Sequence, residues 1–118
     1  MSLLSRYFQP IRNSDGVDWT PARAVGFFHL SDLAAQVYGP GVTLRTTPVD
    51  GDLLVTLWRT DVSSPYGELV PLDPVDGEPR QIWIDDCGTW RDIDGRELHG
   101  RIAQYASVPA TIVWEAVR

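Results

Sequence analysis

Two alternating, β-branched segments joined by a short glycine-containing stretch constrain the fold of this chain most strongly. Residues 42–47 and 53–60 have the composition of β-strands, and the stretch between them, residues 48–52, is Pro-Val-Asp-Gly-Asp. Because glycine tolerates a positive φ, this pattern predicts a β-hairpin. The second strand carries apolar side chains on both faces, which predicts a central strand covered on both sides. These side chains are Leu53, Val55 and Leu57 on one face and Leu54 and Trp58 on the other.

Further strand signals follow in the second half of the chain. The sequence Pro-Val-Asp-Gly at residues 48–51 recurs at residues 74–77, so we expect the same turn chemistry twice. Periodicity and composition predict the remaining strands. They are residues 68–72 as a short edge strand, residues 81–85 and 89–93 as a pair joined by residues 86–88, and residues 111–117 as an interior strand.

Helix signals occur near both ends of the chain. Thr20 before Pro21 predicts a helix start, and Ser31 predicts the cap of a second helix. Asp94 and Glu97 have the spacing of a capping box and predict a third. The expected helices span residues 21–28, 32–38 and 94–106, the last with Leu98, Ile102 and Tyr105 as its buried stripe, and a short helix is expected within residues 2–8.

These elements predict an α+β fold, because the strands cluster in the middle of the chain without regular alternation with helices. We expect a single globular domain over residues 1–118, with an antiparallel or mixed sheet of five to six strands and two or three helices on one face. Residues 1–18 form an N-terminal segment, and residues 61–79 form a long Pro/Gly-rich loop. Loops of that length in a small domain tend to be functional or mobile.

The charge of the chain excludes some partners. Sixteen acidic and ten basic residues give a formal net charge of −6, and no segment is rich in cations, so nucleic acid is not an expected partner. No apolar run is long enough for a membrane span, and a single cysteine fits a reducing compartment, so we expect a cytoplasmic protein with no membrane partner. All ten basic residues are arginine, a bias typical of a high-G+C bacterium or one of its phages.

No pattern of catalytic or metal-binding residues stands out. The densest acidic group fails the calcium-loop spacing, and turns and helix caps account for its members: Asp85, Asp86, Asp92, Asp94 and Glu97. The only cysteine, Cys87, and the two histidines, His29 and His99, have no spacing typical of a nucleophile or a zinc site. We therefore expect no catalytic residue, no metal and no cofactor.

The residues expected to bind a partner combine acidic and aromatic side chains. Tyr66 is placed at the tip of the long loop, and two tryptophans flank the turn at residues 86–88. The candidates are Tyr66, Glu68, Asp73, Asp76, Trp83, Trp90 and Arg91.

The function expected from this pattern is a small, acidic, non-enzymatic protein-binding module, an accessory or inhibitory protein whose partner is another protein with a basic surface. Two alternatives remain open. One is a self-assembling structural subunit of a virion or compartment, which would form a homo-oligomer. The other is a small enzyme without a recognisable motif.

Overall fold

The computed structural model describes residues 16–104 and 109–117. The helix expected within residues 2–8 lies outside this range, as does most of the N-terminal segment. A single helix, α2 (Pro21–Tyr38), spans the region where two were predicted. Its N-cap is Thr20, whose side chain accepts a hydrogen bond from the backbone N–H of Arg23, and it ends at Gly39, which has a φ of 80°. The cap predicted at Ser31 is wrong, because no glycine or proline interrupts the helix there and buried Leu30 and Ala34 continue its apolar face.

Five strands form an antiparallel sheet in the order β1-β2-β4-β5, with β3 paired to β2 beside this path. The central position of the predicted second strand is confirmed, and so are the short strand and the hairpin pair that follow it. The strands are β1 (Val42–Val49), β2 (Asp52–Thr60), β3 (Leu69–Pro71), β4 (Gln81–Ile84) and β5 (Trp90–Arg91).

The repeated Pro-Val-Asp-Gly sequence forms the same kind of turn twice, as predicted. In the β1–β2 turn, Asp50 has a φ of 50° and Gly51 a φ of 86°. In the β3–β4 turn, Asp76 has a φ of 51° and Gly77 a φ of 82°. Positive φ at both central residues is typical of type I′ turns, whose twist matches that of the flanking strands.

The predicted helix over residues 94–106 is wrong for the described residues, because residues 98–103 are a strand. There β6 (Leu98–Ala103) pairs with β7 (Thr111–Ala116) in a separate antiparallel hairpin. The residues before β6 form a turn around Asp92 rather than a helix start at Asp94. One oxygen of the Asp92 carboxylate accepts the backbone N–H groups of Asp94 and Arg96, both at 2.9 Å. This turn and Gly95, with a φ of 83°, reverse the chain where a helix start was expected.

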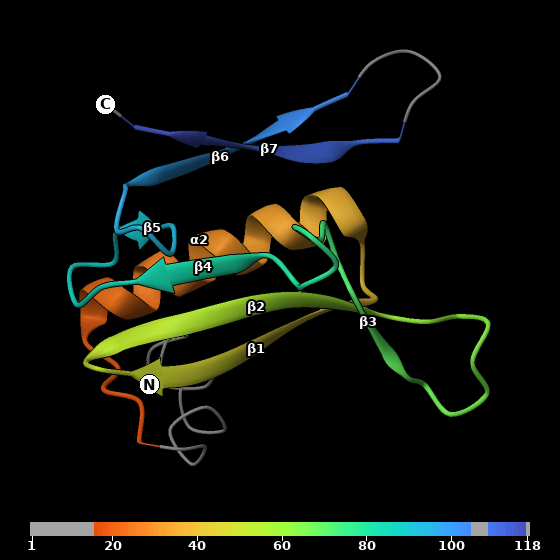
Figure 1. Ribbon diagram of the computed structural model, residues 1–118, viewed down its shortest axis with the longest axis horizontal. Helices are drawn as coiled ribbons and strands as arrows, with labels where there is room; N and C mark the ends of the chain where they lie inside the picture. The colour runs from red at the N-terminus through yellow and green to blue at the C-terminus, as the bar shows by residue number, and fades with distance from the viewer. Residues whose placement is uncertain (1–15, 105–108, 118) are drawn as a thin grey trace, which may run out of the picture.

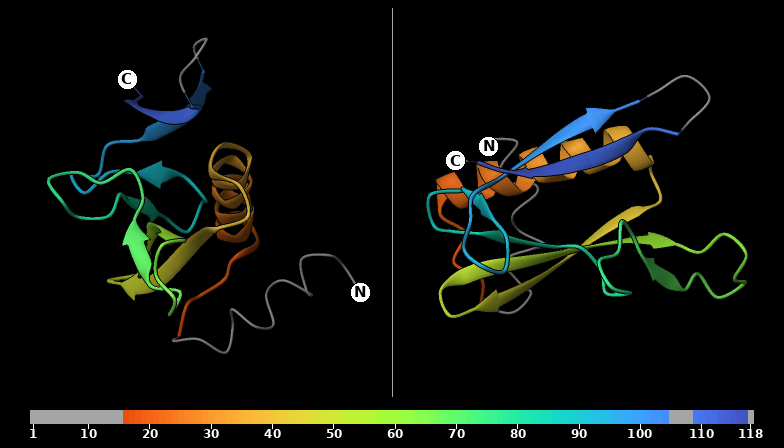
Figure 2. Two further views of the ribbon diagram at one scale, coloured as in Figure 1. Left: turned by 90° about the vertical axis from the view of Figure 1, so that its right-hand side faces the viewer. Right: turned by 45° about the horizontal axis from the view of Figure 1, so that its top comes forward.

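The expectation of an interior position for the last strand is also wrong. Within the described residues, β7 pairs only with β6. The hairpin lies on the opposite side of α2 from β1 and β2 (Figures 1 and 2). Gly100 of β6 packs so closely that an added Cβ would lie 2.8 Å from the Leu33 side chain of α2 and 2.9 Å from Trp114 of β7. Leu33 of α2 and Trp114 of β7 both lie against Gly100, so the hairpin packs on the helix.

The hydrophobic core forms where α2 meets one face of the five-stranded sheet. Helix, sheet and hairpin all contribute to one cluster of buried residues: Phe27, Leu30, Ala34, Leu53, Val55, Leu57, Leu72, Ile82, Ile84 and Leu98. The other face of β2 carries Leu54, Thr56 and Trp58, which are partly exposed. Within the described residues, the prediction that both faces of this strand are covered is thus confirmed for the inner face and only in part for the outer face. Among the described residues, no helix has the length and apolar character that crossing a membrane requires.

Candidate functional site

The loop between β2 and β3, residues 61–68, extends away from the body of the sheet (Figure 1). It carries the two most exposed of the large apolar side chains in the described part of the chain: Val62 is 96% exposed and Tyr66 is 88% exposed. Glu68, also exposed, lies at its base, beside the terminal β2–β3 pair Thr60 and Leu69. Tyr66 and Glu68 are thus two predicted binding residues that the structure places on one element.

Hydrogen bonds within this β2–β3 loop fix its shape. The N–H of Asp61 donates to the carbonyl of Glu68 at 2.7 Å, and the N–H of Ser64 donates to the carbonyl of Asp61 at 3.1 Å. The Asp61 carboxylate accepts the Ser63 hydroxyl at 2.7 Å and the Ser63 N–H at 3.0 Å, and these bonds lower the pKa of Asp61. Tyr66 is therefore presented from a loop with a preformed conformation, which reduces the entropy lost on binding.

Asp73 and Asp76 lie away from this loop and have different surroundings. The Asp73 carboxylate accepts the indole N–H of Trp114 at 2.5 Å and lies 3.7 Å from Nε of Arg80. It connects the β3–β4 segment to the β6–β7 hairpin. Asp76 is exposed in the β3–β4 turn.

Trp83 and Trp90 point to opposite faces of the sheet, because Ile84 pairs with Trp90 while Trp83 pairs with Arg91. Trp90 faces the helix: its indole N–H donates to the carbonyl of Gly26 at 2.9 Å, and its ring centroid lies 6.2 Å from that of Trp114. Trp83 and Arg91 share the outer face. The two tryptophans therefore do not form one binding surface, and the strand register is what separates them.

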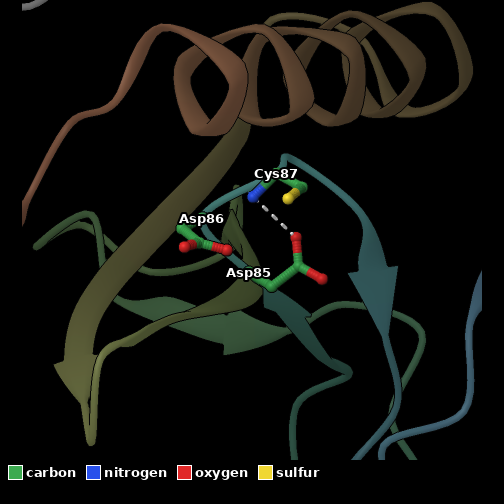
Figure 3. A group of neighbouring side chains, drawn as sticks. All are labelled: Asp85, Asp86 and Cys87. Atoms are coloured by element: carbon green, nitrogen blue, oxygen red, sulfur yellow. Dashed lines mark hydrogen bonds between the residues drawn. The ribbon is translucent and has the colours of Figure 1, made fainter.

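The turn between β4 and β5 brings Asp85, Asp86 and Cys87 together (Figure 3), with one potential ligand atom of each residue within 4.8 Å of the others. Asp86 lies in the turn, as predicted, whereas Asp85 was predicted to end the strand; β4 ends at Ile84, so Asp85 belongs to the turn as well. One Asp85 oxygen accepts the N–H groups of Cys87 and Thr89, and the other accepts Nε–H of Arg91 at 3.0 Å. Asp85 thus has the turn role that the sequence predicted.

The acidic neighbours of Cys87 disfavour its thiolate form. Its thiol is exposed, and the negative charge of Asp86 and a hydrogen bond to that carboxylate raise its pKa. At neutral pH the thiolate fraction is consequently below that of an ordinary cysteine.

The two histidines line a shared groove of about 300 Å³ between α2 and the start of β6. His29 comes from the helix and His99 from the strand, with exposed Glu97 beside them. In residues 16–104 and 109–117, only the Asp85–Cys87 turn brings three His, Cys, Asp or Glu side chains close enough to share a metal ion. Neither histidine belongs to that group. The groove therefore has no preassembled ligand set among the described residues.

Because of the Asp85 carboxylate, we expect the folded protein to lose stability in acid. Partial burial favours its neutral form, but hydrogen bonds from Thr89, Arg91 and Cys87 outweigh this effect and hold the pKa of Asp85 below its ordinary value of 3.8. A lowered folded-state pKa contributes stability that is present above the unfolded pKa and is lost as the pH falls through the folded pKa. As the pH falls from about 5 to about 2, we expect the free energy of unfolding of wild type to approach that of Asp85→Asn. Urea denaturation of both proteins over this pH range measures the difference. A wild-type minus variant difference that does not change with pH would contradict this role.

No protein-family model, no curated protein and no solved structure matches the chain.

Proposed function

We propose that this protein is a non-enzymatic protein-binding module that contacts its partner through the β2–β3 loop. The observation that carries the proposal is the near-complete exposure of Val62 and Tyr66 on a loop that its own hydrogen bonds hold in shape. Large apolar side chains exposed together mark interaction sites more often than isolated ones do, and tyrosine is among the residues that dominate binding energy.

The charge of the chain supports a basic partner surface. The net charge is −6, and the loop itself carries Asp61 and Glu68 beside its apolar tip. Complementary charge around an apolar anchor speeds association and suppresses wrong partners. These features best support an accessory or inhibitory role in a high-G+C bacterium or its phage. The protein would act by occupying a basic surface of another protein.

A capture experiment with matched variants tests the loop. The tagged protein would be incubated with a lysate of its own host, and recovered proteins quantified for wild type and for the double variant Val62→Ser with Tyr66→Ala. Removing two apolar anchors is expected to lower recovery of the specific partner at least about tenfold. Ile102→Ser, at a β6 side chain that is 43% exposed, is the control and is expected to bind as wild type does.

Two results would overturn the proposal. Equal recovery of the same partner with wild type and the loop variant would remove the loop from the binding site. Recovery of only a second copy of this chain, with a matching increase in mass by light scattering, would support the self-assembling subunit instead.

A further inference from the structure

A second surface lies along β4, where residues of three turns border two adjoining hollows. One hollow, of about 220 Å³, is lined partly by Val75 and Glu78 of the β3–β4 turn. The other, of about 230 Å³, is lined partly by Asp50 of the β1–β2 turn and by Trp83. Asp92 and Ile93, in the turn between β5 and β6, line both, so the hollows form one surface depression, which we name the turn groove.

The turn groove offers apolar surface to a ligand. Ile93, between the two hollows, is 73% exposed, and Val75 at the far side is 45% exposed. Pro79 adds apolar surface to the lining of the first hollow, and Val49 adds it to the lining of the second. Exposed aliphatic side chains beside such hollows can be covered by an aliphatic side chain of a partner.

The carboxylates of the turn groove have no cationic partners within the described part of the chain. Its two arginines are already paired, Arg80 with Asp73 at 3.7 Å and Arg91 with Asp85 at 3.0 Å. The four carboxylates of the groove take part in no ion pair of the described residues: Asp50, Asp52, Glu78 and Asp92. The groove therefore has an excess of negative charge that an incoming cation can neutralise.

From this combination we propose that the turn groove binds a basic, amphipathic segment of a partner protein. Arginine or lysine side chains of that segment contact the four carboxylates. An aliphatic side chain of the segment, placed between two of its cationic residues, covers Ile93. The carboxylates surround an apolar centre, which a segment of alternating basic and aliphatic residues complements in both charge and hydropathy. This surface is separate from the β2–β3 loop and does not depend on the function proposed for that loop.

The probe is the peptide acetyl-Arg-Leu-Arg-Leu-Arg-Leu-amide, titrated into the ¹⁵N-labelled full chain and followed by NMR. We expect saturable shifts of the Trp83 indole and of the Ile93 and Val75 amides. Raising the salt from about 0.05 to 0.5 M should weaken binding, because exposed charge pairs are screened. The peptide with glutamate in place of arginine is expected to cause no saturable shift.

The test variant removes charge without changing turn geometry. Asp50→Asn suits a type I′ turn, Asp92→Asn keeps an oxygen that can accept the turn's N–H groups, and Glu78→Gln keeps the side-chain length. Combined, these substitutions are expected to weaken peptide binding at least about tenfold. Ile93→Ser tests the apolar contact separately, at a side chain too exposed to endanger the fold.

A matched control removes the same net charge elsewhere. Asp18→Asn, Asp32→Asn and Asp86→Asn are exposed substitutions that do not line the groove. We expect this triple variant and the Val62→Ser, Tyr66→Ala loop variant to bind the peptide as wild type does, within about twofold. Equal weakening by both triple variants, unaltered binding by Ile93→Ser, or the absence of saturable shifts at the groove would overturn the proposal. Since the loop variant is scored separately, failure of the groove and failure of the loop are distinguishable.

Discussion

Replacing Gly88 with alanine is expected to lower the free energy of unfolding by at least about 3 kcal/mol. Gly88 lies in the β4–β5 turn with a φ of 83°, and a Cβ there would be 2.2 Å from the carbonyl oxygen of Ala22 in α2. The contact is between backbones, so no side chain can move aside. A hydrogen bond of 2.9 Å from the Thr20 hydroxyl to the carbonyl of Asp86 holds the same turn against the helix.

Gly41→Ala is the control for this prediction. An added Cβ at Gly41 meets nothing within 4 Å, and its φ is not positive, so we expect a change within about 0.5 kcal/mol. Urea denaturation monitored by tryptophan fluorescence measures both variants. If Gly88→Ala is as stable as Gly41→Ala, the close packing of the turn on α2 is incorrect.

Replacing Trp114 with alanine is expected to cost about 3–5 kcal/mol. Trp114 attaches the β6–β7 hairpin to the rest of the molecule. Its ring packs on Trp90 and lies 5.8 Å from the Arg80 guanidinium, and a Cβ added at Gly100 would be 2.9 Å from it. Its indole N–H donates to Asp73. In Trp114→Ala, hydrogen exchange should show the amides of β6 and β7 losing protection before the amides of β2.

Trp114→Phe separates the packing of the ring from the hydrogen bond. It retains an aromatic ring but leaves the Asp73 carboxylate without its indole donor, which is expected to cost about 1–3 kcal/mol. Equal stability of wild type, Trp114→Phe and Trp114→Ala would contradict the attachment of the hairpin through this residue.

Local chemistry made the central hairpin predictable. Its two strands alternate, and the Asp-Gly pair between them tolerates the positive φ that a type I′ turn requires and that Asp50 and Gly51 adopt. The same reasoning applies to Asp76 and Gly77. Neither prediction needed information about distant residues.

Competing local signals explain the error at residues 94–106. Asp94 and Glu97 have capping-box spacing, but the Asp92 carboxylate accepts the N–H groups of Asp94 and Arg96 in a tight turn instead. The supposed helical stripe also fails within the described residues, because Ile102 is 43% exposed whereas Leu98 is 8% exposed. Only the pairing of β6 with β7 decides between the two structures.

Residues of the candidate sites were predictable to different degrees. Tyr66 between proline and glycine was predicted at a loop tip and lies exposed there, although its role in binding stays a prediction. The structural role of Asp73 depends on Trp114, which is 41 residues away in sequence, so no local pattern could reveal it. Ile93 was expected within a strand, and its exposure follows from β5 ending at Arg91.

Crosslinking from the loop tip tests the central claim most directly. The photoreactive residue p-benzoylphenylalanine would replace Tyr66 in one variant and Ile102 in another, each irradiated in the protein's own host cells. The proposed function predicts a covalent adduct with one other protein from position 66 and none with that protein from position 102. No adduct from position 66, or the same adducts from both positions, would contradict binding through the β2–β3 loop.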